Sequence, residues 1–192
     1  MALTPSTMLP LGTEAPAFRL PAANPDRAGG DAVALDDVAR GEGGARPFVV
    51  VFTCNHCPYA VSVEGRLVEQ ARRWQAQGLG VVAVSSNDAE AYPADSFGAM
   101  AERAAERDLP FPYLYDESQD VARAYDAACT PDFYLFGADR RLVYRGRLDD
   151  GRPGRPPTTS DLDDAVQELR QSGRVTAPQV PSMGCNIKWR AP

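Results

Sequence analysis

The chain has 192 residues, of which 44% are apolar, so it can bury one sizeable core and is expected to form a single domain over residues 1–192. Its 26 acidic and 20 basic side chains give a net charge of −6, which argues against a nucleic-acid-binding surface. No window of about 18 apolar residues is present for a membrane span, and the amino terminus lacks the basic and apolar regions of an export signal. We therefore expect a soluble, cytoplasmic protein that binds neither nucleic acid nor membrane.

The elements predicted first are short strands, followed by a central one. Residues 14–20 and 32–35 are separated by a loop rich in Pro, Gly and Asp, which predicts edge strands or a hairpin. The apolar run at residues 48–52 is typical of a strand that is buried on both faces. This run is followed directly by Cys54-Asn55-His56-Cys57-Pro58.

Helices and strands alternate along the remainder of the chain. Apolar residues at helical spacing predict a helix over 59–77, and an uninterrupted apolar run predicts a strand over 79–84. Asp95-Ser96 is suited to capping a helix that reaches Arg107. The later predictions are a strand at 113–115, a helix at about 118–127, strands at 133–136 and 142–145, a helix from 159 or 160 to about 171, and an irregular tail at 173–192. The two strands at 133–145 are joined by a short turn and must be antiparallel, so the sheet is expected to be mixed.

The two cysteines of the CxxC motif lie between a predicted strand and a predicted helix, where Pro58 suits the first helical turn. Unpaired N–H groups and the helix dipole stabilise a thiolate there, so Cys54 is predicted to be a nucleophile near neutral pH. Cys57 is close enough in sequence to attack the mixed disulfide that Cys54 would form.

His56 is the only histidine, and it lies between the two thiols. Its protonated imidazole would favour the Cys54 thiolate, although a solvent-exposed loop histidine is the alternative interpretation. Asn55 adds no charge, so we expect an intermediate reduction potential.

The order of these elements resembles the thioredoxin-like superfamily, and more narrowly its redoxin branch, the peroxiredoxin-like AhpC/TSA proteins. The residues that carry the resemblance are the CxxC with its flanking elements, Thr130-Pro131 before a hairpin, the extra helix and strand between 87 and 117, and the leading Gly12-x-x-Ala15-Pro16-x-Phe18-x-Leu20. The resemblance implies an α/β fold with a central mixed β-sheet flanked by helices, an N-terminal β extension and an α/β insertion.

The resemblance also implies that Pro131 follows a cis peptide bond beside the CxxC. Thr130 would then contact the substrate, whose backbone would pair with it like an added strand. Thioredoxins bury an Asp in the strand before the CxxC, whereas residues 48–52 contain only Phe and Val. Either water or Glu64 is therefore expected to take the proton of Cys57, or Cys57 is expected to react slowly.

Thr53 raises the alternative of a hydroperoxide reductase, because peroxiredoxins carry a Thr shortly before their peroxidatic cysteine, here Cys54. They also carry an Arg near the position of Thr130. Residues 125–135 contain no Arg, so the negative charge that develops on an attacked peroxide would lack a cationic partner. A redox sensor that forms its disulfide without turnover is a further alternative.

Cys129 and Cys185 allow three interpretations. Both can be small buried residues, they can pair in a disulfide that holds the tail, or a tail that packs back can receive oxidation from Cys54 and Cys57. A zinc site with Cys54, His56, Cys57 and one distant cysteine is the metal-binding alternative. It is disfavoured because adjacent His56 and Cys57 do not easily chelate one ion.

The sequence thus predicts a thiol–disulfide oxidoreductase that needs no metal and no organic cofactor. Cys54 attacks a substrate disulfide and Cys57 resolves the product, while His56, Asn55 and Thr53 tune the potential. The partners implied are a protein or small-molecule disulfide and a thiol electron donor. The chain is expected to be a monomer or a homodimer.

Overall fold

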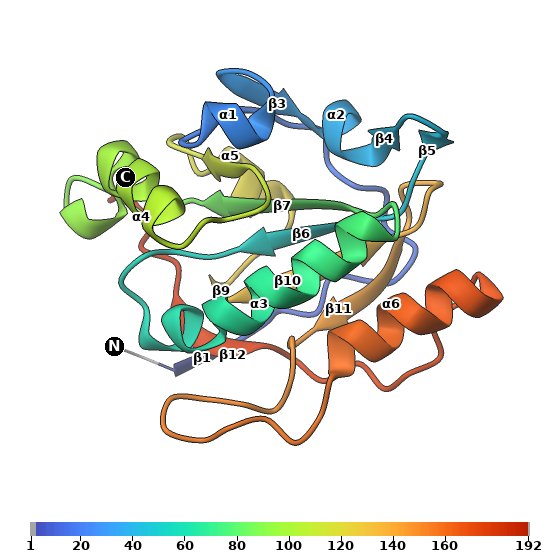
Figure 1. The fold of residues 1–192 in the computed structure, drawn as a ribbon. Coiled ribbons are helices and arrows are strands. Elements are labelled where there is room, and N and C mark those ends of the chain that lie inside the picture. The colour runs from blue at the N-terminus through green and yellow to red at the C-terminus, as the bar shows by residue number, and fades with distance from the viewer. Residues whose placement is uncertain (1–2, 192) are drawn as a thin grey trace.

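The computed structural model describes residues 3–191 (Figure 1). Its strands are β1 Leu3–Pro5, β2 Arg19–Pro21, β3 Ala32–Ala34, β4 Arg40–Gly41, β5 Gly44–Ala45, β6 Phe48–Phe52, β7 Gly80–Ser85, β8 Tyr113–Tyr115, β9 Cys129–Thr130, β10 Asp132–Phe136, β11 Leu142–Gly146 and β12 Met183–Asn186. Its helices are α1 Pro25–Ala28, α2 Leu35–Ala39, α3 Pro58–Ala76, α4 Phe97–Glu106, α5 Asp120–Ala124 and α6 Asp161–Ser172, with a 3-10 turn, η1, at Pro93–Asp95.

The central sheet has five strands in the order β11-β10-β6-β7-β8. β6, β7 and β8 are parallel, and β10 is antiparallel to both β6 and β11. The mixed sheet predicted from the short turn of the last hairpin is therefore confirmed. Helices cover both faces of this sheet, with α3 and α6 on one side and α2 and α5 on the other (Figure 1).

β6 is apolar throughout because both of its faces are covered. Val49 and Val51 belong to the core beneath α3 and α6, whereas Phe48, Val50 and Phe52 belong to the core beneath α2 and α5. All five side chains are buried. Side chains alternate between the two faces of a strand, so a doubly covered strand has no polar positions.

Several predicted elements agree with the structure to within two residues: the long helix after the CxxC is α3, the apolar run after it is β7, and the final helix is α6. Ser96 is the N-cap of α4, where its hydroxyl accepts a hydrogen bond from the backbone N–H of Ala99. No helix within residues 3–191 is long and apolar enough to cross a membrane.

Two predicted elements are shorter than expected. The helix predicted over 118–127 is only α5, because Tyr125 caps it and Asp126 then has a φ of 51°, outside the helical region. The strand predicted within 14–20 is restricted to β2, and Glu14 forms only an isolated bridge with Arg141.

The irregular tail predicted over 173–192 is wrong at residues 183–186, which form β12. This strand lies between β1 and β9 in a separate three-stranded sheet and is antiparallel to both. Its sequence, Met-Gly-Cys-Asn, has little intrinsic strand propensity. It forms because β1 and β9, which are distant in sequence, supply its hydrogen-bonding partners.

Candidate active site

The CxxC motif lies between the end of β6 and the start of α3, and β9 brings Thr130 against it. The Cys54 Sγ lies 3.3 Å from the Thr130 Oγ1, and the Cys57 Sγ lies 3.1 Å from the Thr130 carbonyl oxygen. The peptide bond between Thr130 and Pro131 is cis. The structure therefore brings together the four residues to which the sequence assigned attack, resolution and substrate contact.

The structure corrects the position of Cys54 relative to the helix. α3 begins at Pro58 and its N-cap residue is Cys57. Cys54 therefore lies three residues before the N-cap, outside the helix. Cys57 has no exposed surface, whereas Cys54 retains 5% of its surface. The N-terminus of α3 thus acts most directly on Cys57, the inner cysteine, while Cys54, the outer cysteine, is the one of the two that retains some exposed surface.

The two thiols are hydrogen-bonded to each other and titrate as a pair. The hydrogen bond from Cys54 lowers the pKa of Cys57 to about 4. The same hydrogen bond, burial and the nearby Asp95 carboxylate raise the pKa of Cys54. The two opposite shifts favour a single negative charge on the pair, with the Cys57 sulfur as its main carrier.

The remaining proton can reside on the Cys54 or the Cys57 sulfur, because Thr130 offers each of them a hydrogen-bonding partner. A protonated Cys57 donates to the Thr130 carbonyl oxygen. The Thr130 hydroxyl is then available to donate to a Cys54 thiolate. A shift of the proton from Cys54 to Cys57 moves the negative charge onto the more accessible sulfur without leaving either group unpaired.

The lowered pKa predicts an unusual pH dependence of thiol reactivity. The pair keeps one thiolate at every pH above the lowered pKa, so the total alkylation rate of Cys54 and Cys57 by iodoacetamide should stay nearly constant between pH 6 and 8. An ordinary thiol with a pKa near 8.5 would gain about seventyfold over the same two pH units. The protein unfolded in guanidinium chloride is the control, and a tenfold rise per pH unit in the folded protein would contradict the assignment.

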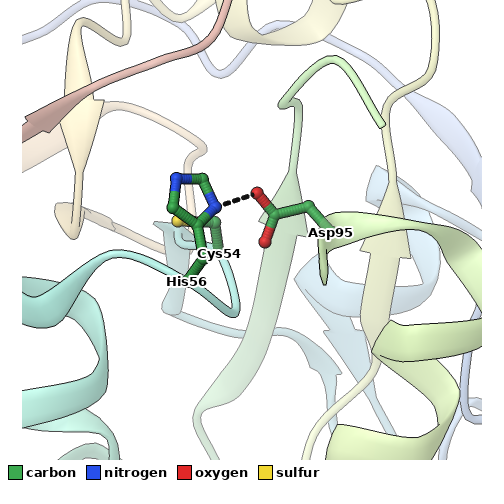
Figure 2. Close-up of side chains that lie close together, drawn as sticks. All are labelled: Cys54, His56 and Asp95. Carbon is green, nitrogen blue, oxygen red and sulfur yellow. Dashed lines mark hydrogen bonds and ion pairs between the residues drawn. The ribbon is translucent and has the colours of Figure 1, made fainter. Parts of the chain in front are cut away.

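Asp95 is the functional residue that the sequence analysis missed, because it was assigned only to a helix cap. It ends η1 and is completely buried. Its Oδ1 accepts a hydrogen bond from the Asn55 backbone N–H at 2.7 Å, and its Oδ2 lies 2.8 Å from the Asn87 Nδ2. The same Oδ2 lies 2.5 Å from the His56 Nδ1 (Figure 2). This carboxylate therefore holds the loop between the two cysteines from outside the motif.

His56 is held on two sides rather than lying free in a loop. Its ring stacks on Tyr92 with centroids 5.2 Å apart and an interplanar angle of 8°, and its Nδ1 bonds Asp95. Its Nε2 is buried without a hydrogen-bond partner among the described residues. Ligand atoms of Cys54, His56 and Asp95 lie within 4.8 Å of one another, but both Asp95 oxygens already accept hydrogen bonds, so the cluster is a hydrogen-bonded network.

Asn55 and Thr53, the other two residues expected to tune the potential, are held in place by hydrogen bonds. Asn55 is fixed by the Tyr113 hydroxyl, which donates to its Oδ1 at 3.0 Å. Thr53 is held through its backbone N–H, which donates to the Val84 carbonyl. Glu64 forms an ion pair with Arg103 at 2.6 Å and is therefore committed away from Cys57, contrary to one of the expectations.

The four cysteines are buried thiols, so the disulfide between Cys129 and Cys185, one of the three interpretations of these residues, is not formed. The Cys129 Sγ is directed to the Pro131 carbonyl, at 3.8 Å. Cys185 instead packs in one cluster with Cys54 and Cys57. The tail does return to the CxxC, as one of the sequence interpretations required.

The backbone of Thr130 is also not open to an added strand in this structure. β12 pairs with β9, and Cys185 lies opposite Thr130 in the register. Thr130 is only 2% exposed, and Pro131 is buried as well. The edge that the resemblance assigned to substrate is thus occupied by the chain's own tail.

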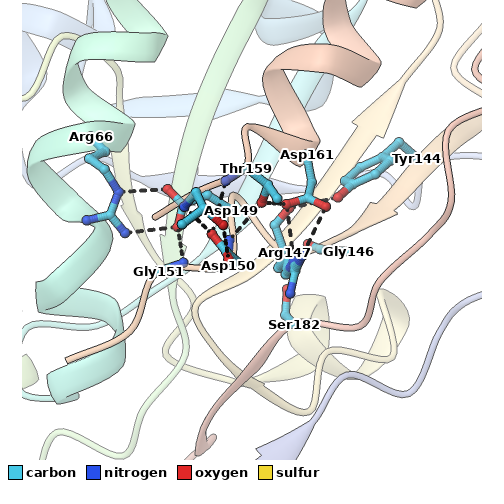
Figure 3. A network of polar contacts seen from close by, with 11 residues as sticks. Arg66, Tyr144, Gly146, Arg147, Asp149, Asp150, Gly151, Thr159, Asp161 and Ser182 are labelled. Carbon is cyan, nitrogen blue, oxygen red and sulfur yellow. Dashed lines mark hydrogen bonds and ion pairs between the residues drawn. The ribbon is translucent and has the colours of Figure 1, made fainter. Parts of the chain in front are cut away.

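A groove with a cavity of about 240 Å³ begins at Pro131 and is lined mainly by apolar side chains, among them Tyr59, Phe133, Leu148 and Met183. A network of charged groups holds its outer wall (Figure 3). The network comprises Arg66 with both carboxylate oxygens of Asp149, Arg147 with Asp161, and Asp150 with the backbone N–H groups of Thr158 and Thr159. The segment between β11 and α6 is thereby fixed against α3, which carries Arg66.

The AhpC/TSA family model matches residues 11–145. An uncharacterized conserved protein from Geobacillus kaustophilus is 46% identical, with a TM-score of 0.91 over 100% of this chain and 98% of its own. A hypothetical protein from Sinorhizobium meliloti 1021 is 42% identical, with a TM-score of 0.89 over 98% of this chain and 100% of its own. No curated protein matches the chain.

More distant solved structures share the fold. The thioredoxin domain of a thiol-disulfide oxidoreductase from Bacteroides vulgatus is 18% identical, with a TM-score of 0.60 over 84% of this chain and 98% of its own. The fold, with the CxxC at its strand–helix junction, places the chain in the class of thioredoxin-like proteins. Within that class, the chain belongs to the AhpC/TSA family.

Proposed function

We propose that the protein is a thiol–disulfide oxidoreductase that cycles between a Cys54–Cys57 dithiol and disulfide. The observation that carries the proposal is the geometry of the two thiols at Thr130: the Cys54 Sγ lies 3.3 Å from its Oγ1 and the Cys57 Sγ lies 3.1 Å from its carbonyl oxygen. The lowered pKa of Cys57, caused by its hydrogen bond from Cys54, supports a thiolate in this pair. When Cys54 is the thiolate, the proton resides on the Cys57 sulfur, which donates a hydrogen bond to the Thr130 carbonyl oxygen. A nucleophile and its resolving partner are therefore prepared together.

In the proposed reaction the Cys54 thiolate attacks one sulfur of a substrate disulfide and expels the other as a thiolate. Cys57 then attacks the Cys54 sulfur of the mixed disulfide, which releases the second substrate thiol and leaves a Cys54–Cys57 disulfide. A thiol electron donor returns the pair to the reduced form. His56 and Asp95 hold the loop in place, and the Thr130 hydroxyl positions the Cys54 sulfur.

Peroxide reduction is less well supported. Asp95 is the charged group that acts on the Cys54 thiol, and its negative charge opposes the development of further negative charge there. A peroxide expels its charge on an oxygen, which is a poorer leaving group than the sulfur of a disulfide and needs a donor or cation to stabilise it. For the substrate we propose that the groove at Pro131 takes an apolar group flanking the disulfide.

Two measurements test the proposal. We expect the protein to accelerate the reduction of insulin by dithiothreitol in a catalytic amount, and to equilibrate with glutathione through one reversible disulfide between Cys54 and Cys57. Cys129→Ser is the matched control, because this thiol is equally buried but bonded to Pro131. Turnover of hydrogen peroxide without turnover of insulin would contradict the proposal, and so would a disulfide that forms without any turnover.

A further inference from the structure

Cys185 lies at the CxxC although it is more than 120 positions away from it in the chain. β12 carries it, and it forms one buried cluster with Cys54, Cys57 and Ala60. Its exposed fraction is 4%, close to that of Cys54. The site therefore contains three thiols, of which the dithiol mechanism uses two.

Cys57 is the sulfur that both of the other thiols contact. Its Sγ accepts a hydrogen bond from the Cys54 side chain and another from the Cys185 side chain, as well as from the Cys185 backbone N–H. Burial, followed by the hydrogen bond to Cys57, raises the pKa of Cys185 to about 11, so Cys185 is the protonated donor in the reduced protein. Two candidate disulfide partners are thus in contact with one sulfur.

The position of Cys185 is fixed by the strand that carries it. β12 is bonded on both edges, with Cys185 opposite Leu3 of β1 and opposite Thr130 of β9. Gly184 packs so closely on Thr130 that a Cβ at this position would lie 2.0 Å from the Thr130 carbonyl oxygen. A thiol held in this way does not need a loop movement to reach Cys57.

We propose that Cys185 is a third redox-active residue of this site, and that it converts the Cys54–Cys57 disulfide into a Cys57–Cys185 disulfide. The Cys185 sulfur forms a bond to the Cys57 sulfur, and the bond between Cys54 and Cys57 breaks. Cys54 leaves with the electron pair of that bond and receives the proton that Cys185 gives up. One disulfide replaces another, so the exchange needs no further oxidant or reductant.

The exchange returns Cys54 to the thiol form while the protein remains oxidised. The protein then has a free thiol at Cys54 and a disulfide between Cys57 and Cys185. Such a form can open a second substrate disulfide without first being reduced, which is the requirement for disulfide isomerisation. The inference rests on the proposed function in one respect: the reaction with a substrate disulfide is what forms the Cys54–Cys57 disulfide.

Mass spectrometry of the digested protein can separate the two disulfides. Trypsin places Cys54 and Cys57 in the peptide 41–66, because the Arg46–Pro47 bond resists cleavage, and it places Cys185 in the peptide 175–188. Reduced wild type is oxidised with diamide, quenched with acid, alkylated with N-ethylmaleimide and digested. We expect two products: an internal disulfide in 41–66, and a cross-link between 41–66 and 175–188 with Cys54 alkylated.

The variant Cys54→Ser isolates the inferred bond. In this variant we expect the cross-link between the two peptides to become the main oxidised product, whereas Cys57→Ser should lose it. Cys129→Ser is the matched control and should give the wild-type pattern. Circular dichroism verifies that each variant is folded. The cross-link in wild type is measured without any substitution, so that result does not depend on the folding of a variant.

The outcomes distinguish the inference from the proposed function. An internal disulfide in wild type with no cross-link in either wild type or Cys54→Ser would overturn the role of Cys185 and leave the dithiol mechanism intact. Formation of the cross-link in both, with no turnover of insulin by wild type, would support the inference and overturn the proposed function. A cross-link that persists in Cys57→Ser would assign the bond to Cys54 and would also contradict the inference.

Discussion

Replacing Cys57 with Ser is expected to stop turnover while a mixed disulfide with the substrate accumulates on Cys54. The resolving step needs a second sulfur next to Cys54, and Ser cannot form a disulfide. Replacing Cys54 with Ser should also stop turnover, but without any adduct, because the accessible nucleophile is lost. We expect the insulin reduction rate to fall by at least about a hundredfold in both variants, to the rate of the dithiothreitol reductant alone.

The adduct distinguishes the two roles. Reaction with oxidised glutathione followed by intact-mass measurement should show a stable glutathione adduct on Cys57→Ser and none on Cys54→Ser. Cys129→Ser should retain wild-type turnover, because its thiol bonds only to the Pro131 carbonyl. A stable adduct on Cys54→Ser would mean that Cys57 is the attacking thiol, in spite of its complete burial.

Replacing Gly184 with Ala is expected to destabilise the protein and to reduce the Cys57–Cys185 cross-link together. A Cβ at this position would lie 2.0 Å from the Thr130 carbonyl oxygen and 2.7 Å from its carbon, and these backbone atoms cannot move aside as the end of a side chain can. Overpacking of this kind costs about 1–3 kcal/mol, occasionally more. We expect the free energy of unfolding in urea to fall by about that amount, because β12 must move away from β9.

Gly65→Ala is the matched control for this substitution. Gly65 is exposed within α3, and a Cβ there meets nothing within 4 Å. Because Ala has the higher helix propensity, this variant should be unchanged or more stable by about 0.5–1 kcal/mol. Equal stability of Gly184→Ala and wild type would show that β12 does not pack on Thr130 as described.

The sequence could predict the elements that local patterns specify. Residues 48–52 are apolar on both faces, which indicates a doubly covered strand whatever its neighbours are. Pro58 and the apolar spacing after it specify α3, and the short turn before Leu142 specifies an antiparallel hairpin. These features, with the CxxC and Thr130-Pro131, were sufficient for the fold and for the residues proposed to react.

Long-range contacts decided what local patterns could not. From the sequence, Asp95 was interpreted only as a helix cap. Its contacts with Asn55 and His56 could not be predicted, because these residues lie 40 and 39 positions earlier in the chain. α5 is shorter than its pattern because Asp126 adopts a positive φ that the sequence does not announce.

The sequence by itself determined a thioredoxin-like order of strands and helices and a pair of cysteines at a strand–helix junction, because both depend on periodicity and spacing within short segments. Only the tertiary structure decided that β12 covers Thr130 and that Cys185 contacts Cys57. A strand of low intrinsic propensity forms when distant partners supply its hydrogen bonds, and such partners come together only in the folded chain.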